Sequence, residues 1–282
     1  MTIVAVWLKN HTCTNQSLLE CVADSRVTNE DSNHTISQLL NNSAKIFSIP
    51  VVARCPGETG EYDTQYYVDS FGLAFSGSSL IGLNLASTIS SLTSQLVGRT
   101  REAIPSFQDI ADFAVRITRK YVDAIGQLQG RVPPFKGAIF GWCHGDSKFK
   151  LLSFGPVSTT SPDVFTVLVD LTVPDSVFLM GNHTEEIADR IREFQQRFQP
   201  SAARDVVPKN IIWGLIYDRI FEDIGGELQH GRGSSKGFFL YPNVRSVLNE
   251  DQQTFRDQVS FRGLDLYDDS TVGSVGPCRP FF

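Results

Sequence analysis

Short apolar runs separated by polar segments predict strands over the first eighty residues. The runs Thr2–Lys9 and Leu18–Asp24 flank the polar segment HTCTNQS, a pattern typical of a hairpin. The first run is almost continuously apolar, which indicates a strand that is covered on both faces. Further strands are expected at Ala44–Ile49 and Phe71–Phe75, with a turn-rich insertion between them. The second of these strands ends in the sequence SGSS at 76–79.

Apolar residues at helical spacing predict two helices next. The second of them begins at Ser106, where Asp109 three residues later is typical of a capping box, and its apolar stripe ends at Ile125. In the first helix, the stripe expected to be buried is Leu80, Leu83, Ala86, Ile89, Leu92 and Leu96. Strands are expected to return at 137–143, 149–154, 164–171 and 176–180.

The last third of the chain predicts two more helices, one strand and a polar tail. A third helix has its apolar stripe between Ile187 and Phe198, and a fourth begins near Pro208 and ends at Gly225-Gly226. The segment GRGSSKG at 231–237 has the composition of a phosphate loop. It matches neither the P-loop nor the dinucleotide pattern, so we interpret it as a turn before a strand at 237–241.

The predicted elements come in runs of strands and runs of helices, which argues against a doubly wound nucleotide-binding fold. Pairs of helices outside two stacked sheets account for this order. We therefore predict an α+β fold of the four-layer α-β-β-α sandwich type. One such domain is expected over residues 1–241, followed by a C-terminal extension over 242–282 whose role the sequence does not give.

Composition and charge exclude several classes of protein. With 25 Lys and Arg against 31 Asp and Glu, the net charge is −6, so the chain has no basic footprint for nucleic acid or anionic lipid. No apolar run approaches the roughly 18 residues of a membrane span. The first residues lack the basic and long apolar regions of a signal peptide, and the five cysteines are scattered. We expect a cytoplasmic protein without nucleic-acid or membrane partners.

Common catalytic and cofactor motifs are missing from the sequence. The five histidines form no HExxH motif, and the GxSxG pattern of α/β-hydrolases is absent. The cysteines contain no CxxC pair of the kind that binds zinc. The sequence therefore predicts neither a metal nor a cofactor.

Thr2 carries the candidate chemistry, because an initiator methionine is normally removed before a small residue. Removal of Met1 would leave a free α-amine, whose ordinary pKa is about 7.7–8.0, on the residue that also carries a hydroxyl. Thr2 Oγ would then act as a nucleophile with its own amine as the base. The alternative is that Thr2 serves only as a β-branched strand residue.

Three further segments stand behind Thr2 in the chain: ADSRVT at 23–28, SAKIFSI at 43–49 and GLAFSGS at 72–78. In this order, they resemble segments of the β-type subunits of the proteasome and of its bacterial relatives, the N-terminal nucleophile hydrolases. There they supply an aspartate, a lysine and a backbone N–H. The resemblance covers about residues 2–100 well, and 137–241 through the order of elements. The intervals between the matched residues are longer here than is usual in that family.

The resemblance implies a role for each matched residue. Thr2 Oγ would attack a carbonyl carbon, Lys45 would stay charged beside it, and Asp24 would pair with Lys45 and fix its position. The N–H of Gly77 would donate to the developing oxyanion, and Asp223 would orient the N-terminal amine. The alternative for Lys45 and Asp24 is a solvated ion pair worth at most about 1 kcal/mol, and for Gly77 an ordinary turn.

Two helper serines of that family are missing here. A late turn reads Met180-Gly181-Asn182-His183, and the run FEDIGG at 221–226 has no serine. Asn182 is a candidate replacement for a hydroxyl, and Glu222 is an alternative to Asp223.

The implied function is hydrolysis of peptides or other amides by a proteasome-like threonine peptidase, through an acyl-Thr2 intermediate, in a homo-oligomeric ring. Two alternatives stay open, an inactive scaffold subunit of the same fold and an amidase for small substrates. The sequence identifies no ATPase partner.

Overall fold

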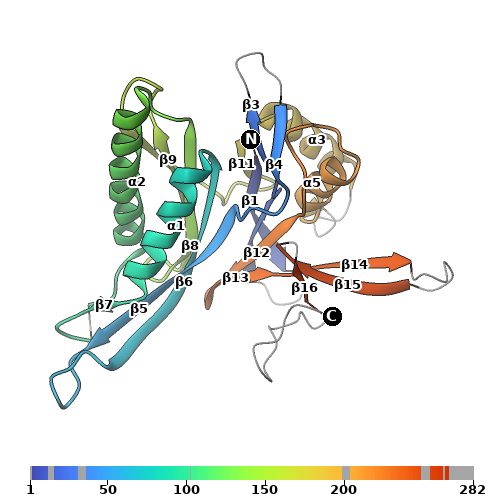
Figure 1. Cartoon of the computed structure of the whole chain (residues 1–282). Coiled ribbons are helices and arrows are strands. Elements are labelled where there is room, and N and C mark those ends of the chain that lie inside the picture. Colours follow the sequence, from blue (N-terminus) through green and yellow to red (C-terminus); the bar gives the residue numbers. More distant parts are fainter. Residues whose placement is uncertain are drawn as a thin grey trace.

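The chain folds into two larger β-sheets, two smaller sheets and helices that cover the larger sheets (Figure 1). The computed structural model describes residues 2–11, 16–30, 36–101, 103–198, 204–248, 255–262 and 264–266. Strands and helices occur in separate runs along the chain, so the predicted α+β class is confirmed. No helix in the described part of the chain is both long enough and apolar enough to cross a membrane.

The first sheet has five strands, all paired antiparallel. Their spatial order is β11 (Val177–Gly181), β1 (Ile3–His11), β2 (Gln16–Ala23), β12 (Gln229–Ser234) and β13 (Gly237–Tyr241). The interior strand β1 is apolar on both faces, as the sequence predicts, because it is covered on both sides.

The second sheet has six strands, of which only the short β7 pairs in parallel among the described residues. Their order is β10 (Val164–Val169), β9 (Lys148–Pro156), β8 (Phe135–Cys143), β6 (Thr64–Gly77), β5 (Ile46–Cys55) and β7 (Leu96–Val97). Strands β5 and β6 extend far into the segment that the sequence predicts to be an insertion. Their pairing continues to Cys55 and Thr64, so most of that insertion is one long hairpin.

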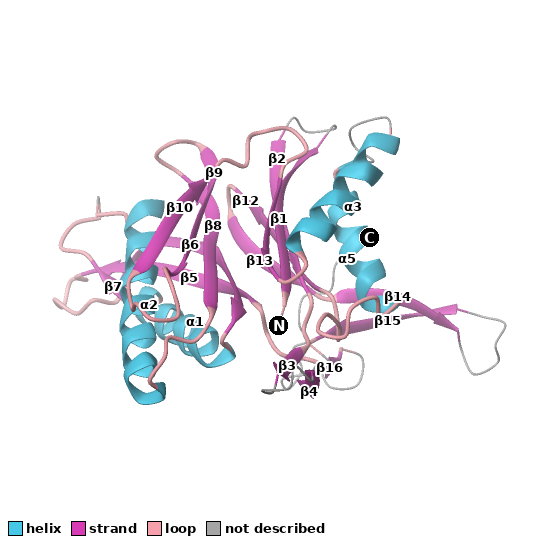
Figure 2. Ribbon diagram, turned by 90° about the horizontal axis from the view of Figure 1, so that it is seen from above, coloured by secondary structure: helices cyan, strands magenta, loops and turns pink. Residues whose placement is uncertain are grey.

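Three hydrophobic clusters stabilise this arrangement. One lies between the two sheets and includes Val4, Cys21, Ala74 and Phe140. A second joins the six-stranded sheet to helices α1 (Ser79–Thr93) and α2 (Phe107–Gln129). A third joins the outer face of the five-stranded sheet to α3 (Thr184–Arg197) and α5 (Val207–Tyr217). Figure 2 shows the two pairs of helices on opposite sides of the sheets.

Two small sheets lie outside the predicted strands, and the second of them occupies the predicted polar tail. The first pairs β3 (Val27–Glu30) with β4 (Ile36–Leu40), and the second contains β14 (Asn243–Leu248), β15 (Phe255–Phe261) and β16 (Leu264–Asp265). In the second, Val259 and Leu266 are buried and the Arg262 guanidinium donates to the Ile46 carbonyl at 2.7 Å. The part of 242–282 that the structure describes therefore packs on the rest of the chain.

Three predicted details of the helices and of one turn are wrong. Helix α1 buries Ile81, Leu85 and Ile89, whereas Leu80, Leu83 and Leu92 of the predicted stripe are exposed, because this helix is apolar on two adjoining faces. The fourth predicted helix ends at Tyr217 rather than at Gly225-Gly226. The segment 231–237 is the β12–β13 hairpin, with only its centre forming a turn.

Candidate active site

Thr2 lies immediately before β1 and is 1 % exposed. Its carbonyl oxygen accepts a hydrogen bond from the Asn182 N–H at 2.9 Å, which joins it to the end of β11. Gly181 makes this approach possible, because its φ of +120° and its position both exclude a side chain. A Cβ there would lie 1.8 Å from the Thr2 carbonyl oxygen. The β1–β11 pairing therefore fixes the main chain of Thr2.

Lys45 precedes β5, and its ammonium group reaches the Thr2 side chain. Lys45 Nζ donates to Thr2 Oγ1 and also to the Arg26 carbonyl at 2.9 Å. Lys45 is 2 % exposed and is one of the largest buried side chains among the described residues. The structure thus places the lysine predicted from the sequence beside the predicted nucleophile.

Gln229 holds the backbone that carries Lys45. Its Oε1 accepts hydrogen bonds from the N–H groups of Lys45, at 2.9 Å, and Ile46, at 3.2 Å. Its Nε2 donates to the Ser43 carbonyl at 2.6 Å. Because Gln229 is the first residue of β12, the five-stranded sheet positions the lysine at the start of the other sheet.

Asp24 follows β2 and is fully buried. One carboxylate oxygen accepts the Ile3 N–H at 3.0 Å, and the other accepts the N–H groups of Arg26 and Gly225, both at 3.2 Å. The carboxylate therefore joins the first residue after Thr2 to the Gly225-Gly226 turn. It also acts on Lys45 through its charge.

Burial dominates the electrostatics of Asp24 and Lys45. It raises the pKa of Asp24 above the ordinary 3.8, while the Lys45 charge and the three N–H donors oppose this rise. Burial also lowers the pKa of Lys45 below the ordinary 10.5, against the attraction of Asp24. The alternative of a solvated ion pair at the hairpin end is therefore wrong, since both side chains lie in the interior.

Gly77 ends β6 at the edge of a pocket of about 960 Å³. Lys45, Asn182 and Gly181 line the same pocket. The φ of Gly77 is +87°, and a Cβ would lie 2.3 Å from the Pro134 carbonyl oxygen, so only glycine fits this turn. An open cavity thus reaches the lysine and the glycine together.

Asp223 contacts the two residues that follow β11, Asn182 and His183. Its buried carboxylate accepts from Asn182 Nδ2 at 2.8 Å and is paired with His183 Nε2 at 3.0 Å. The His183 ring stacks on Phe221 with centroids 3.9 Å apart. Glu222, the alternative acid, is exposed. The predicted Asn182 and Asp223 are therefore brought together, and Asn182 in turn is hydrogen-bonded to Thr2.

Gln229 and His183 are the residues of this site that the sequence analysis misses. Gln229 stands in a run of polar and glycine residues without strand periodicity. His183 follows the candidate residue Asn182, but no local pattern in the sequence places it beside Asp223, forty residues later. In the described ranges, no three His, Cys, Asp or Glu side chains gather closely enough to hold a metal ion.

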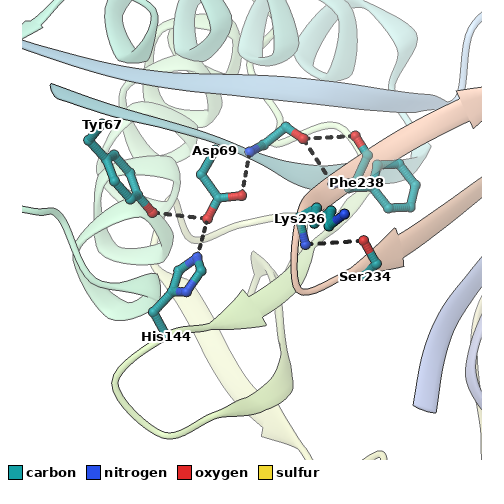
Figure 3. Close-up of polar contacts among 7 residues, drawn as sticks. Tyr67, Asp69, His144, Ser234, Lys236 and Phe238 are labelled. Atoms are coloured by element: carbon teal, nitrogen blue, oxygen red, sulfur yellow. Dashed lines mark hydrogen bonds and ion pairs between the residues drawn. The ribbon is translucent and has the colours of Figure 1, made fainter. Parts of the chain in front are cut away.

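A second polar cluster, drawn in Figure 3, contains none of the residues that line this pocket. The buried Asp69 carboxylate accepts from Tyr67 Oη at 2.9 Å and is paired with His144 Nε2 at 3.1 Å. Burial and the Asp69 charge raise the pKa of Tyr67. Next to it, the Ser70 hydroxyl bonds both main-chain groups of Phe238, at 2.8 and 2.9 Å. This cluster joins the two sheets, so a structural role accounts for it.

Comparison with known proteins overturns the family predicted from the sequence. No model of a protein family matches the chain, and no curated protein matches it. Among solved structures, Anbu (ancestral beta-subunit) from Yersinia bercovieri is similar, with a TM-score of 0.49 and 12 % identity over 85 % of this chain and 86 % of that one. A likeness this distant assigns neither a family nor an activity. The short segments around Asp24, Lys45 and Gly77 are common enough to occur outside the proteasome β-type subunits, and the assignment to that family is wrong.

Proposed function

We propose that this chain is an amide hydrolase whose nucleophile is the Thr2 hydroxyl. The observation that carries the proposal is the hydrogen bond from the buried Lys45 ammonium to Thr2 Oγ1. A buried lysine costs free energy and is retained where it has a partner or a task. The proposal requires removal of Met1, because only a free α-amine supplies a base on the nucleophilic residue itself.

In the first half of the reaction, Thr2 Oγ attacks the carbonyl carbon of the substrate amide. The hydroxyl proton passes to the Thr2 amine, and the Lys45 ammonium stabilises the developing alkoxide. The Gly77 N–H is the proposed donor to the oxyanion, a contact whose loss typically costs ~10²–10³ in rate. Collapse of the tetrahedral intermediate breaks the C–N bond, and the leaving amine takes the proton.

In the second half, a water molecule attacks the acyl-Thr2 ester and gives its proton to the same amine. Collapse releases the carboxylic acid and returns the proton to Thr2 Oγ. Asp24 attracts the Lys45 ammonium through its charge and accepts a hydrogen bond from the Ile3 N–H at 3.0 Å. It is therefore proposed to position both the lysine beside the Thr2 hydroxyl and the main chain next to Thr2. Asp223, through Asn182, is proposed to orient the amine.

The proposal extends to the finer features of the fold and of the assembly. The three hydrophobic clusters support a four-layer α-β-β-α sandwich. The exposed Leu80, Leu83 and Leu92 on α1 support association with further copies of the chain, which light scattering would measure. Buried free cysteines support a reducing, cytoplasmic compartment. The pocket of about 960 Å³ is large enough for a peptide or for a smaller amide.

Mass spectrometry and labelling test the nucleophile. The intact protein is expected to begin at Thr2 and to take up one equivalent of a peptide epoxyketone, which bridges the hydroxyl and the amine. Thr2→Ala is expected to abolish the adduct and turnover, and Thr2→Ser to retain part of both. Thr172→Ala, at an exposed threonine, serves as the matched control. An active preparation that keeps Met1, or normal hydrolysis by Thr2→Ala, would overturn the mechanism.

A further inference from the structure

The pocket that Lys45 and Gly77 line has a positively charged wall among its described residues. Three of its side chains are cationic, those of Lys45, Arg131 and Lys136, and none of the described residues that line it is Asp or Glu. This contrasts with the whole chain, in which acidic residues outnumber basic ones. We propose, resting on the amide-hydrolase function above, that the substrate carries a carboxylate next to the scissile amide and that Lys136 and Arg131 bind it.

The register of the second sheet places Lys136 close to the proposed oxyanion donor. In the β6–β8 pairing, Lys136 lies opposite Ser76, and Phe135 lies opposite Gly77. Two residues further along, Ala138 lies opposite Ala74, and both of these face the cluster between the sheets. Because side chains alternate along a strand, Lys136 is on that same inner face, toward the five-stranded sheet.

Within the described part of the chain, the Lys136 ammonium has an aromatic neighbour but no counterion. Its Nζ lies 5.5 Å from the centre of the Phe178 ring in β11. Among the described residues, neither Lys136 nor Arg131 forms an ion pair. Lys136 is half-buried, so part of its solvation is already lost and an anion in the pocket would restore a partner. An unbalanced pair of cations attracts anions and favours charged over neutral ligands.

The chemistry of the proposed reaction decides which anion this is. Amides that a threonine nucleophile can cleave, such as peptides and acylated amino acids, carry carboxylates as their common anionic group. A carboxylate accepts from Lys136 and from the fork of the Arg131 guanidinium together. It has two sources, an acidic side chain on the acyl side of the amide or the free carboxylate of a terminal amino acid on the amine side.

Matched pairs of peptide substrates test the inference and separate the two sources. One pair differs by Glu against Gln on the acyl side, and the other by a free against an amidated C-terminal residue on the amine side. We expect kcat/KM to favour the charged member of one pair by about threefold to fivefold, the scale of one partly exposed ion pair. The preference is expected to weaken as salt is raised.

Three variants assign the preference to the pocket. Lys136→Gln and Arg131→Gln are expected to lower kcat/KM for the charged substrate more than for its neutral partner. Lys236→Gln, in the exposed turn of the β12–β13 hairpin, is expected to leave both unchanged. Equal turnover of both members in both pairs, or a preference that survives Lys136→Gln, would overturn the inference while leaving Thr2 as the nucleophile. Loss of turnover for all four peptides together with no Thr2 adduct would overturn the proposed function and this inference with it.

Discussion

The buried pair of Lys45 and Asp24 allows a quantitative test of the site by a double-mutant cycle. Lys45→Met keeps most of the side-chain volume but leaves the Asp24 carboxylate, which is fully buried, without its countercharge. Breaking a buried pair by removing one partner costs about 3–5 kcal/mol. The three N–H groups that bond Asp24 place the expected loss at the lower end, about 3 kcal/mol.

The second half of the cycle removes the other charge. Asp24→Asn alone leaves the Lys45 ammonium buried, with Thr2 Oγ1 and the Arg26 carbonyl as its partners, and is expected to cost about 3 kcal/mol as well. The double variant has no uncompensated charge. It is therefore expected to cost about 3–4 kcal/mol rather than the sum of the two, which corresponds to a coupling energy of about 2–3 kcal/mol.

Urea unfolding followed by tryptophan fluorescence gives the free energies of all four proteins. An unchanged m-value is needed for the comparison, because a changed m-value would indicate a different denatured state. Additive effects, within about 0.5 kcal/mol, would refute the electrostatic coupling of Lys45 and Asp24. Loss of less than about 1 kcal/mol in Lys45→Met would refute the burial of this charge, since that is the scale of a solvated pair.

Further substitutions test the support of the site. Gly181→Ala is expected to destabilise by about 2–4 kcal/mol, because its Cβ would strike the neighbouring main chain at a φ of +120°. Gly214→Ala in α5, where a Cβ meets nothing within 4 Å, is expected to stabilise, and chemical unfolding measures both. Gln229→Leu is expected to cost about 1–3 kcal/mol and most of the activity, because two N–H groups lose their acceptor; wild-type turnover would contradict this.

The last prediction concerns pH. Burial is the largest single influence on Glu20 and raises its pKa. The hydrogen bonds and charges of His230 and Arg232 together outweigh it, so the pKa of Glu20 lies below the ordinary 4.5, while burial lowers the pKa of His230 below 6.5. For both groups the folded-state pKa is lower than the ordinary pKa of the unfolded chain. Their contributions to folding stability are therefore complete at a pH above the ordinary pKa, and they are lost as the pH falls through the folded-state pKa. Glu20→Gln is expected to flatten the acid side of a stability–pH profile, and a profile as steep as the wild type would contradict the assignment.

The sequence by itself determines the class of fold and the order of most elements. Apolar periodicity places β1, β2, β8, β9 and the starts of the predicted helices close to their observed positions, because each of these elements buries an apolar face. The sequence predicts these elements because apolar periodicity is a local pattern. The grouping of Thr2, Asp24 and Lys45 rests instead on the resemblance of the short segments around them to those of a known family. Asp24 follows a strand of one sheet and Lys45 precedes a strand of the other, so only the folded chain brings them together.

Only the tertiary structure decides how the site is buried and held. Strand β12 is polar and glycine-rich, and it forms a strand because β2 and β13 pair with it on either side. Its partner β2 lies about 200 residues earlier in the chain. That pairing delivers Gln229 to the backbone of Lys45. Helix α1 has two adjoining apolar faces, and the sheet beneath it selects the one that is buried. Long-range pairing and burial depend on the partners that an element meets, which local patterns do not record.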